Sequence, residues 1–253
     1  MYYFVSDTHF GMDGAVSSAR RERMFTAWLD RIADDAEAIF LVGDIFDFWY
    51  EFRRVAPKGF TRVLGKLGEI TDRGITVHFF TGNHDMWMWD YLQKECGVKM
   101  HARPEVFTLH GRKVFVAHGD NMYVKRPFWE GLMQRMFRSK FLRWVFRTLL
   151  HPDWVVAMGH YWSAKSRKAH IKRHVFCGEN EYLVKYAREY QKALRQVPVD
   201  YFIFGHIHCS EIYPLDAEGR KAVFLGEWLY APSYAALDES GRITLHDIDT
   251  KES

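Results

Sequence analysis

Few cysteines and no long uncharged hydrophobic stretch are found in this sequence of 253 residues. Cys96, Cys177 and Cys209 lack the spacing of a zinc site or a disulfide framework, so we expect free thiols in a reducing compartment. Residues 1–6 have neither the basic segment nor the apolar run of a signal peptide. Nowhere do about 18 uncharged apolar residues follow one another, as a membrane-spanning helix would require. We therefore expect a cytoplasmic protein.

Apolar residues are plentiful enough for a large core. Hydrophobic residues make up 48% of the sequence and aromatic residues 17%, which excludes a disordered chain. The length fits one large α/β domain or a domain that carries an insertion. The net charge of +3 is unevenly spread, because residues 121–175 hold 12 Lys and Arg against two acids, Glu130 and Asp153. This segment therefore carries +10 and the rest of the chain −7.

Helical and strand-like segments alternate over the first 120 residues. The hydrophobic periodicity predicts helices over residues 17–35, 59–72 and 87–95, and strands over residues 2–6, 39–42 and 75–80. His110, Gly111 and Arg112 separate two further apolar runs, which we expect to form a hairpin. Strands separated by helices imply a parallel sheet with right-handed crossovers.

Residues 121–175 interrupt this alternation. We predict a helix over residues 128–150, ended by Pro152, and a second helix over residues 153–172. In the first helix an apolar face opposes a basic one, with Phe137, Phe141, Trp144 and Val145 against Lys140, Arg143 and Arg147. We interpret the segment as a helical cap.

A helix over 179–196 and a strand over 200–204 follow, and four strands near 211–214, 222–225, 234–237 and 243–246 are expected to close an antiparallel second sheet.

Polar turns follow five of the predicted strands. They contain Asp7 and His9, Asp44 and Asp47, Asn83 with His84 and Asp85, His118 and Asp120, and His206 and His208. Open α/β sheets bind ligands at the carboxyl ends of their strands, and the two oxygens of Asp44 can bind two metal ions at once. Imidazole and oxygen ligands suit Mn, Fe or Zn. Because two such ions about 3.5–4 Å apart promote displacement at phosphorus, the sequence predicts hydrolysis of a phosphoester or phosphoanhydride.

These five turns resemble the signature blocks of the calcineurin-like metallophosphoesterases. The resemblance implies an α/β fold, a four-layer αββα sandwich of two mixed sheets, with a core of residues 1–120 and 176–253 and a helical cap insertion of residues 121–175. It implies two divalent ions, with Mn²⁺ preferred over Fe or Zn. One ion would be held by Asp7, His9, Asp44 and His208, and the other by Asp44, Asn83, His118 and His206. His84 would then be catalytic and face the substrate phosphate, with Asp85 orienting its ring. Asp47 and Asp120 would support the turns.

The chain is also similar to the UDP-2,3-diacylglucosamine pyrophosphatases of lipid A biosynthesis, in its length, its Phe48-Trp49-Tyr50 run, its basic insert and the stretch Ser163–Lys168. This similarity implies that the pyrophosphate of UDP-2,3-diacylglucosamine is cleaved to UMP and 2,3-diacylglucosamine 1-phosphate. The implied substrate contacts are Asn83, Lys165, Ser166, Arg167 and Lys168. The cap would hold the protein peripherally on the inner membrane face, with no nucleic-acid partner. At the position of His84 the best-known of these enzymes carry arginine.

Two other functions stay open at this point. A phosphodiesterase or nuclease could use the same metal ligands, because basic patches interleaved with aromatic residues also bind phosphodiester backbones. A non-catalytic scaffold is the more distant alternative, since such proteins usually lose metal ligands and every ligand position is filled here.

Overall fold

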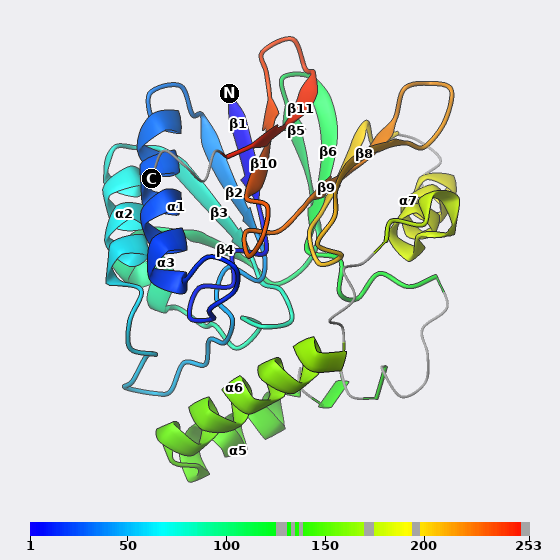
Figure 1. Ribbon diagram of the computed structural model, residues 1–253. Helices are drawn as coiled ribbons and strands as arrows, with labels where there is room; N and C mark the ends of the chain where they lie inside the picture. Colours follow the sequence, from blue (N-terminus) through cyan, green and yellow to red (C-terminus); the bar gives the residue numbers. More distant parts are fainter. Residues whose placement is uncertain (125–130, 133–134, 137–138, 170–174, 194–197, 249–253) are drawn as a thin grey trace.

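The computed structural model describes the backbone of residues 1–124, 131–132, 135–136, 139–169, 175–193 and 198–248. The side chains of residues 140, 160 and 162–169 lie outside this description. Two mixed β-sheets face each other, and helices cover their outer faces (Figure 1). The predicted sandwich of two mixed sheets between helical layers is therefore confirmed.

The first sheet contains six strands in the order β11-β10-β1-β2-β3-β4. Four of them run parallel, namely β1 (Tyr2–Val5), β2 (Ala38–Val42), β3 (Thr76–Phe80) and β4 (Lys99–His101). Beside β1, the antiparallel strands β10 (Ser233–Leu237) and β11 (Ile243–Asp247) complete the sheet. Every residue of β2 is buried, as expected for a central strand that is covered on both faces.

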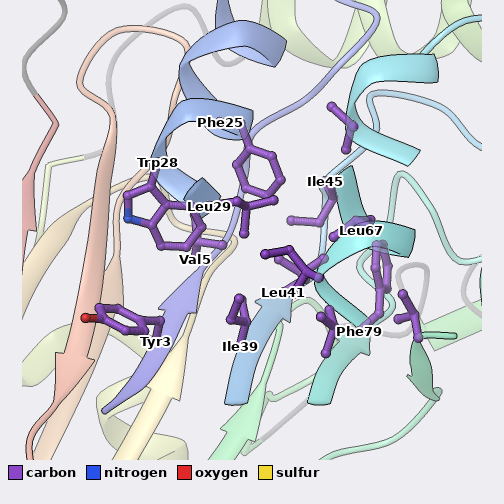
Figure 2. Packing of buried hydrophobic residues seen from close by; sticks show 14 of the residues in the cluster. Tyr3, Val5, Phe25, Trp28, Leu29, Ile39, Leu41, Ile45, Leu67 and Phe79 are labelled. Atoms are coloured by element: carbon purple, nitrogen blue, oxygen red, sulfur yellow. The ribbon is translucent and has the colours of Figure 1, made fainter. Parts of the chain in front are cut away.

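Three helices pack on the outer face of this sheet, α1 (Ser18–Ile32), α2 (Thr61–Asp72) and α3 (Tyr91–Cys96). Successive residues of a strand point to opposite faces, so alternate residues of β2 belong to different cores. Figure 2 shows Ile39 and Leu41 among the side chains that pack with Leu29 of α1. Phe40 and Val42 instead pack toward the second sheet.

The second sheet has five strands in the order β5-β6-β7-β9-β8. They are β5 (Glu105–Leu109), β6 (Arg112–Ala117), β7 (Tyr201–Phe204), β9 (Lys221–Leu225) and β8 (Ser210–Pro214). The three inner strands are parallel, and β5 and β8 pair antiparallel at the edges. After the short 3₁₀ helix η1 (Gly178–Asn180), α7 (Tyr182–Ala193) covers the outer face, where Leu183 packs with Phe115 and Phe202.

The last four strands differ from the predicted antiparallel sheet. β8 pairs antiparallel with β9 and β10 with β11, as predicted, but β9 also pairs parallel with β7, and β10 and β11 join the first sheet. β10 suits its inner position because both of its faces are apolar, with Ala236 packed toward the helices and Ala235 and Leu237 toward the second sheet. Apolar alternation identifies a strand without choosing its neighbours, which is why the prediction of one antiparallel sheet for these four strands was wrong.

The helices predicted over residues 17–35 and 59–72 are present as α1 and α2, whereas α3 is shorter than predicted. The carboxylate of Glu51 accepts hydrogen bonds from the backbone nitrogens of Asp90 (3.1 Å) and Tyr91 (3.4 Å). Trp87 also forms an isolated β-bridge with Tyr50. The residues before Tyr91 therefore pair with the loop that contains Tyr50 and Glu51 instead of beginning the helix. The three-residue strand β4 was not predicted.

Two described helices belong to residues 121–175. α5 (Lys140–Leu149) begins after Ser139, whose hydroxyl accepts a hydrogen bond from the backbone of Leu142, and α6 (Pro152–Ala169) follows it. Much of the helix predicted before Ser139, including Phe137, and the end of the helix predicted over 153–172 lie outside the described residues. Figure 1 shows α5 and α6 on the side of the molecule at which β1 ends. Within the part of the chain that the structure describes, no helix is long and apolar enough to cross a membrane.

Arg143 and Arg147 lie on the side of α5 that faces the sheet-forming part of the chain, where Phe146 also packs, whereas Phe141 and Trp144 face solvent. The guanidinium carbons of Arg143 and Arg147 lie 6.0 and 4.8 Å from the ring centroid of Trp89, where a cation and an aromatic face attract each other. Phe141 and Trp144 are 68% and 57% exposed. The sequence predicted an apolar and a basic face for this helix, but it did not predict which side chains face solvent.

Candidate metal centre

The five polar turns meet at the carboxyl ends of β1, β2, β3, β6 and β7. Asp7, His9, Asp44, His206 and His208 all have left-handed backbone conformations, with φ between +45° and +69°. Such a conformation costs a residue other than glycine about 1–2 kcal/mol, so the surrounding chain has to hold it. Backbone hydrogen bonds between the turns do so, from the nitrogens of Asp7 and His9 to the carbonyl oxygens of residues 43 and 44 at 3.1 Å each.

The first group of ligand atoms comes from Asp7, His9 and His208. The Nε2 atom of His208 lies 3.2 Å from Oδ1 of Asp7 and 3.4 Å from Nε2 of His9. That carboxylate oxygen is buried and has no hydrogen-bond partner among the described residues, while Oδ2 accepts a hydrogen bond from the backbone of His206. A carboxylate oxygen and two imidazole nitrogens that converge in this way fit a divalent ion.

The second group comes from Asp44, His118 and His206, with Asn83 beside them. Nε2 of His118 lies 3.2 Å from Oδ2 of Asp44 and 3.3 Å from Oδ1 of Asn83. Its other ring nitrogen, Nδ1, lies 2.9 Å from the carbonyl oxygen of Val42, which can only accept a hydrogen bond. In the neutral ring Nδ1 therefore carries the proton, and Nε2 is free to bind a metal ion.

Asp44 lies within reach of both groups. Its carboxylate belongs to one possible ligand set with His118 and His206 and to another with His9 and His84. Its Oδ1 accepts a hydrogen bond of 2.8 Å from the backbone nitrogen of His84. This is the placement that a carboxylate shared by two ions requires.

Glycine leaves the space that this carboxylate occupies. A Cβ atom on Gly82 would lie 2.2 Å from Oδ1 and 2.6 Å from the backbone nitrogen of Asp44. A Cβ on Gly43, where φ is +82°, would lie 2.5 Å from Nδ1 of His118. Neither position can carry a side chain without moving a residue of the site.

At Asp44 and His206 the surroundings favour the protonation states that bind metals, whereas, despite burial, Asp47 and Asp7 raise the pKa of His9, and Asp44 raises that of His118. Burial opposes ionisation of Asp44, but His118 and His84 nevertheless hold the pKa of its carboxyl below the usual value. Burial, together with the charge of His118, lowers the pKa of His206 to about 3. Ionised carboxylates and a neutral imidazole are the forms in which these groups act as ligands.

His84 takes its orientation from Asp47. Nδ1 of His84 lies 2.8 Å from the main-chain carbonyl oxygen of Asp47, so the proton on this nitrogen is donated to that carbonyl. The carboxylate of Asp85 accepts hydrogen bonds from the backbone nitrogens of Gly82 (2.7 Å) and Ile45 (2.9 Å). The carboxylate of Asp85 thus holds the two turns together, and its role in orienting the ring of His84 stays a prediction.

For the substrate-binding residues predicted in the insert, the structure describes the backbone but not the side chains. Lys165, Ser166, Arg167 and Lys168 lie in α6, and their side chains are outside the described part of the chain. Their contact with a substrate stays a prediction. Asn83 is different, because its side chain lies beside His118 within the metal centre.

Two buried charged residues near the site were not predicted. Arg21 is fully buried in α1 and donates to the carbonyl oxygen of His9. Glu227 is 5% exposed and precedes Trp228, whose backbone nitrogen donates to the carbonyl oxygen of Asp7. A signal for Arg21 was present in the sequence, because it precedes Met24 and Phe25 by three and four residues on the apolar face of the helix. Glu227 has no comparable signal.

Residues 2–210 match the calcineurin-like phosphoesterase family. The chain belongs to this family, and it is accordingly a metal-dependent hydrolase. It is 40% identical over 250 residues to the UDP-2,3-diacylglucosamine hydrolase of Porphyromonas gingivalis, covering 93% of each chain. It is 23% identical to the protein of the same name from Actinobacillus succinogenes, covering 89% of this chain and 91% of that one. Among solved structures, the phosphoesterase Yfce from E. coli has 14% identity and a TM-score of 0.44, with 98% of this chain and 99% of that chain covered.

Proposed function

We propose that this protein hydrolyses the pyrophosphate bond of UDP-2,3-diacylglucosamine, giving UMP and 2,3-diacylglucosamine 1-phosphate. The observation that carries the proposal is the 40% identity to a UDP-2,3-diacylglucosamine hydrolase over 93% of both chains, since this match extends through the basic insert as well as the metal centre. The donor set of the site is consistent with it, because displacement at phosphorus is the chemistry that two neighbouring divalent ions promote.

The side chains of the centre have separable roles in this reaction. Two divalent ions, for which we favour Mn²⁺ over Fe or Zn, would polarise the phosphoryl oxygens and lower the pKa of water. Asp7, His9 and His208 would hold one ion, Asn83, His118 and His206 the other, and Asp44 both. His84 donates its Nδ1 proton to the carbonyl oxygen of Asp47, so it would protonate the departing phosphate from Nε2, which carries a proton only when the ring is an imidazolium.

Residues 121–175 would act as a cap that receives the acylated part of the substrate. α6 turns Val155 and Gly159 inward, where a Cβ on Gly159 would lie 2.3 Å from the ring of Phe48. Phe48 follows Asp47 directly, so the base of the cap rests on one of the turns of the centre. Lys165, Ser166, Arg167 and Lys168 would contribute polar contacts to the same ligand from the later part of α6.

The outer surface of the cap would contact the membrane that contains this lipid. Phe141 and Trp144 of α5, together with Trp154 and Tyr161 of α6, are each more than half exposed. Exposed aromatic residues next to basic ones are typical of surfaces that bind the membrane interface. The loop between Phe52 and α2, together with the first turn of α2, adds charge, since Arg53, Arg54, Lys58 and Arg62 are exposed and no acid occurs between residues 52 and 68. This arrangement supports peripheral binding to the cytoplasmic face of an anionic membrane.

The substrate is tested by comparing turnover in Mn²⁺. UDP-2,3-diacylglucosamine should be cleaved to UMP, and UDP-N-acetylglucosamine should react much more slowly, since each buried CH₂ contributes about 0.8 kcal/mol to binding. Single-stranded DNA and a cyclic nucleotide complete the set at equal concentration. Faster turnover of the nucleic acid, the cyclic nucleotide or the unacylated sugar nucleotide would refute the lipid substrate.

The membrane contact has its own measurement, co-sedimentation with vesicles that contain anionic lipid. Replacing Phe141 and Trp144 together by serine should weaken binding about tenfold or more, because two large apolar side chains no longer enter the interface. Val106→Ser on β5 is the matched control, since Val106 is also exposed (39%) but lies on a sheet. Equal binding by both variants would remove α5 from the membrane contact.

A further inference from the structure

Arg21 is a buried cation in the first turn of α1. Its side chain has no exposed surface, and it is the one Lys or Arg among the buried residues that the structure describes. Burial lowers the pKa of the guanidinium below its usual value, while Asp13 and Glu227 oppose that shift. Burying a charge is unfavourable unless its hydrogen bonds are met, so the position of Arg21 requires partners of good geometry.

Those partners are backbone carbonyl oxygens of the loop that joins β1 to α1. Nε of Arg21 donates to Thr8 (3.1 Å) and Nη2 donates to His9 (2.9 Å), and the guanidinium also donates to Met12 and Val16. A guanidinium has five N–H donors in a planar fork, so it can satisfy several carbonyl groups at once, as an ammonium group cannot in this geometry. Arg21 thereby joins both ends of the loop to the helix.

Two of the four carbonyl groups belong to the peptide units on either side of the His9 Cα atom. The backbone nitrogen of His9 is held in turn by the carbonyl oxygen of Asp44 at 3.1 Å. His9 has a left-handed backbone conformation, with φ of +45°, which leaves its imidazole correctly placed only while these peptide units keep their orientation. The contacts of Arg21 therefore act on the direction of the His9 side chain.

We propose that Arg21 is a positioning residue for the metal ion bound by Asp7, His9 and His208. It acts through the backbone of His9 and touches neither the ion nor the substrate. The inference rests on the metal centre of the proposed function and adds a residue whose effect is confined to one of the two ions. The second group, around His118 and His206, comes from β6 and β7, and none of the hydrogen bonds of the Arg21 side chain reaches it. Its contact with the loop is made by Asp7, whose Oδ2 accepts a hydrogen bond from the backbone nitrogen of His206.

The test compares Arg21→Lys and Arg21→Met with Arg23→Lys and Arg23→Met, since Arg23 is exposed on the same helix. Metal-free, full-length protein is titrated with Mn²⁺ in a calorimeter, and its unfolding temperature is measured. Both Arg21 variants should weaken one of the two binding steps roughly 10–100-fold and leave the other unchanged, the range observed when a residue that orients a ligand is lost. Both Arg23 variants should bind like the wild type. Equal weakening of both steps, or a lower unfolding temperature with unchanged affinities, would overturn the inference.

A second variant identifies the affected ion. The His9→Ala variant should lack the Mn²⁺-binding step that the Arg21 variants weaken. Adding Arg21→Lys to His9→Ala should leave the remaining binding step unchanged, so weaker binding in that step would contradict the assignment. If the Arg21 variants do not fold, hydrogen exchange of the wild type decides. Mn²⁺ should then slow exchange of residues 9–16, and unchanged exchange would refute the inference. A wild-type protein that binds no Mn²⁺ refutes the metal centre itself, which separates failure of the proposed function from failure of the role of Arg21.

Discussion

Replacing Gly82 by alanine should disable the centre without changing any of its chemical groups. The new Cβ would lie 2.2 Å from Oδ1 of Asp44, whereas ordinary contact begins at 3.4 Å. The carboxylate cannot simply rotate away, because the same Cβ would lie 2.6 Å from the backbone nitrogen of Asp44. Asp44 and its turn therefore have to shift by about 1 Å, and a displacement of that size costs on the order of 100-fold in rate.

The expected result of Gly82→Ala is a fall in kcat/KM of about 100-fold or more, with weaker binding of both Mn²⁺ ions, because Asp44 contacts both groups. Gly65→Ala is the matched control. Gly65 is exposed in α2, and nothing lies within 4 Å of its added Cβ. Alanine there should raise the free energy of unfolding by about 1 kcal/mol and leave turnover unchanged. Wild-type turnover and metal binding by Gly82→Ala would refute the packing argument.

Three other substitutions test different parts of the molecule. Asp44→Ala should abolish turnover and remove both ions, so metal analysis that finds two ions per chain would exclude a shared carboxylate. His84→Ala should retain both ions and lose roughly 10²–10⁴ in rate, the usual range for a proton donor, and wild-type turnover would remove it from the reaction. The pKa of His78 is lowered to about 4, first by burial and then by the charges of His101 and Lys99. Because the unfolded state binds this proton more readily, stability should fall between pH 6.5 and 4, by at most about 2 kcal/mol after solvent screening. His78→Phe, whose ring can keep the stacking on Phe40, should flatten that fall in denaturant titrations, and an unchanged slope would contradict the assignment.

The residues of the centre could be found from the sequence because each of them lies within a few residues of the end of a strand. Asp7, Asp44 and His118 stand at the point where an apolar run gives way to polar residues, and this boundary is a local property. That the strand ends meet follows from the parallel order of β1, β2 and β3 and of β6 and β7, which the alternation of helices and strands also indicates.

What could not be predicted depends on contacts between distant parts of the chain. The orientation of α5 is set by Trp89, which offers an aromatic face to Arg147, and nothing within residues 140–149 identifies that partner. In the same way, the hydrogen bond from His84 to the carbonyl oxygen of Asp47 involves a main-chain atom that has no sequence signature. Side-chain identity suggested Asp85 for that role because it is the adjacent carboxylate.

The position of β1 between β2 and β10 has a consequence for how the protein forms during synthesis. Tyr3 is paired with Ala236, so the strand that leads into Asp7 and His9 is made first and obtains its second neighbour almost last. Closing a contact between such distant segments is slow, because the intervening chain has to be ordered before the pairing is stabilised. Until β10 leaves the ribosome, one edge of β1 is unpaired and open to association with other chains. Enzyme assembly should therefore be a late event, and truncation before β10 should yield aggregated chains that bind no metal.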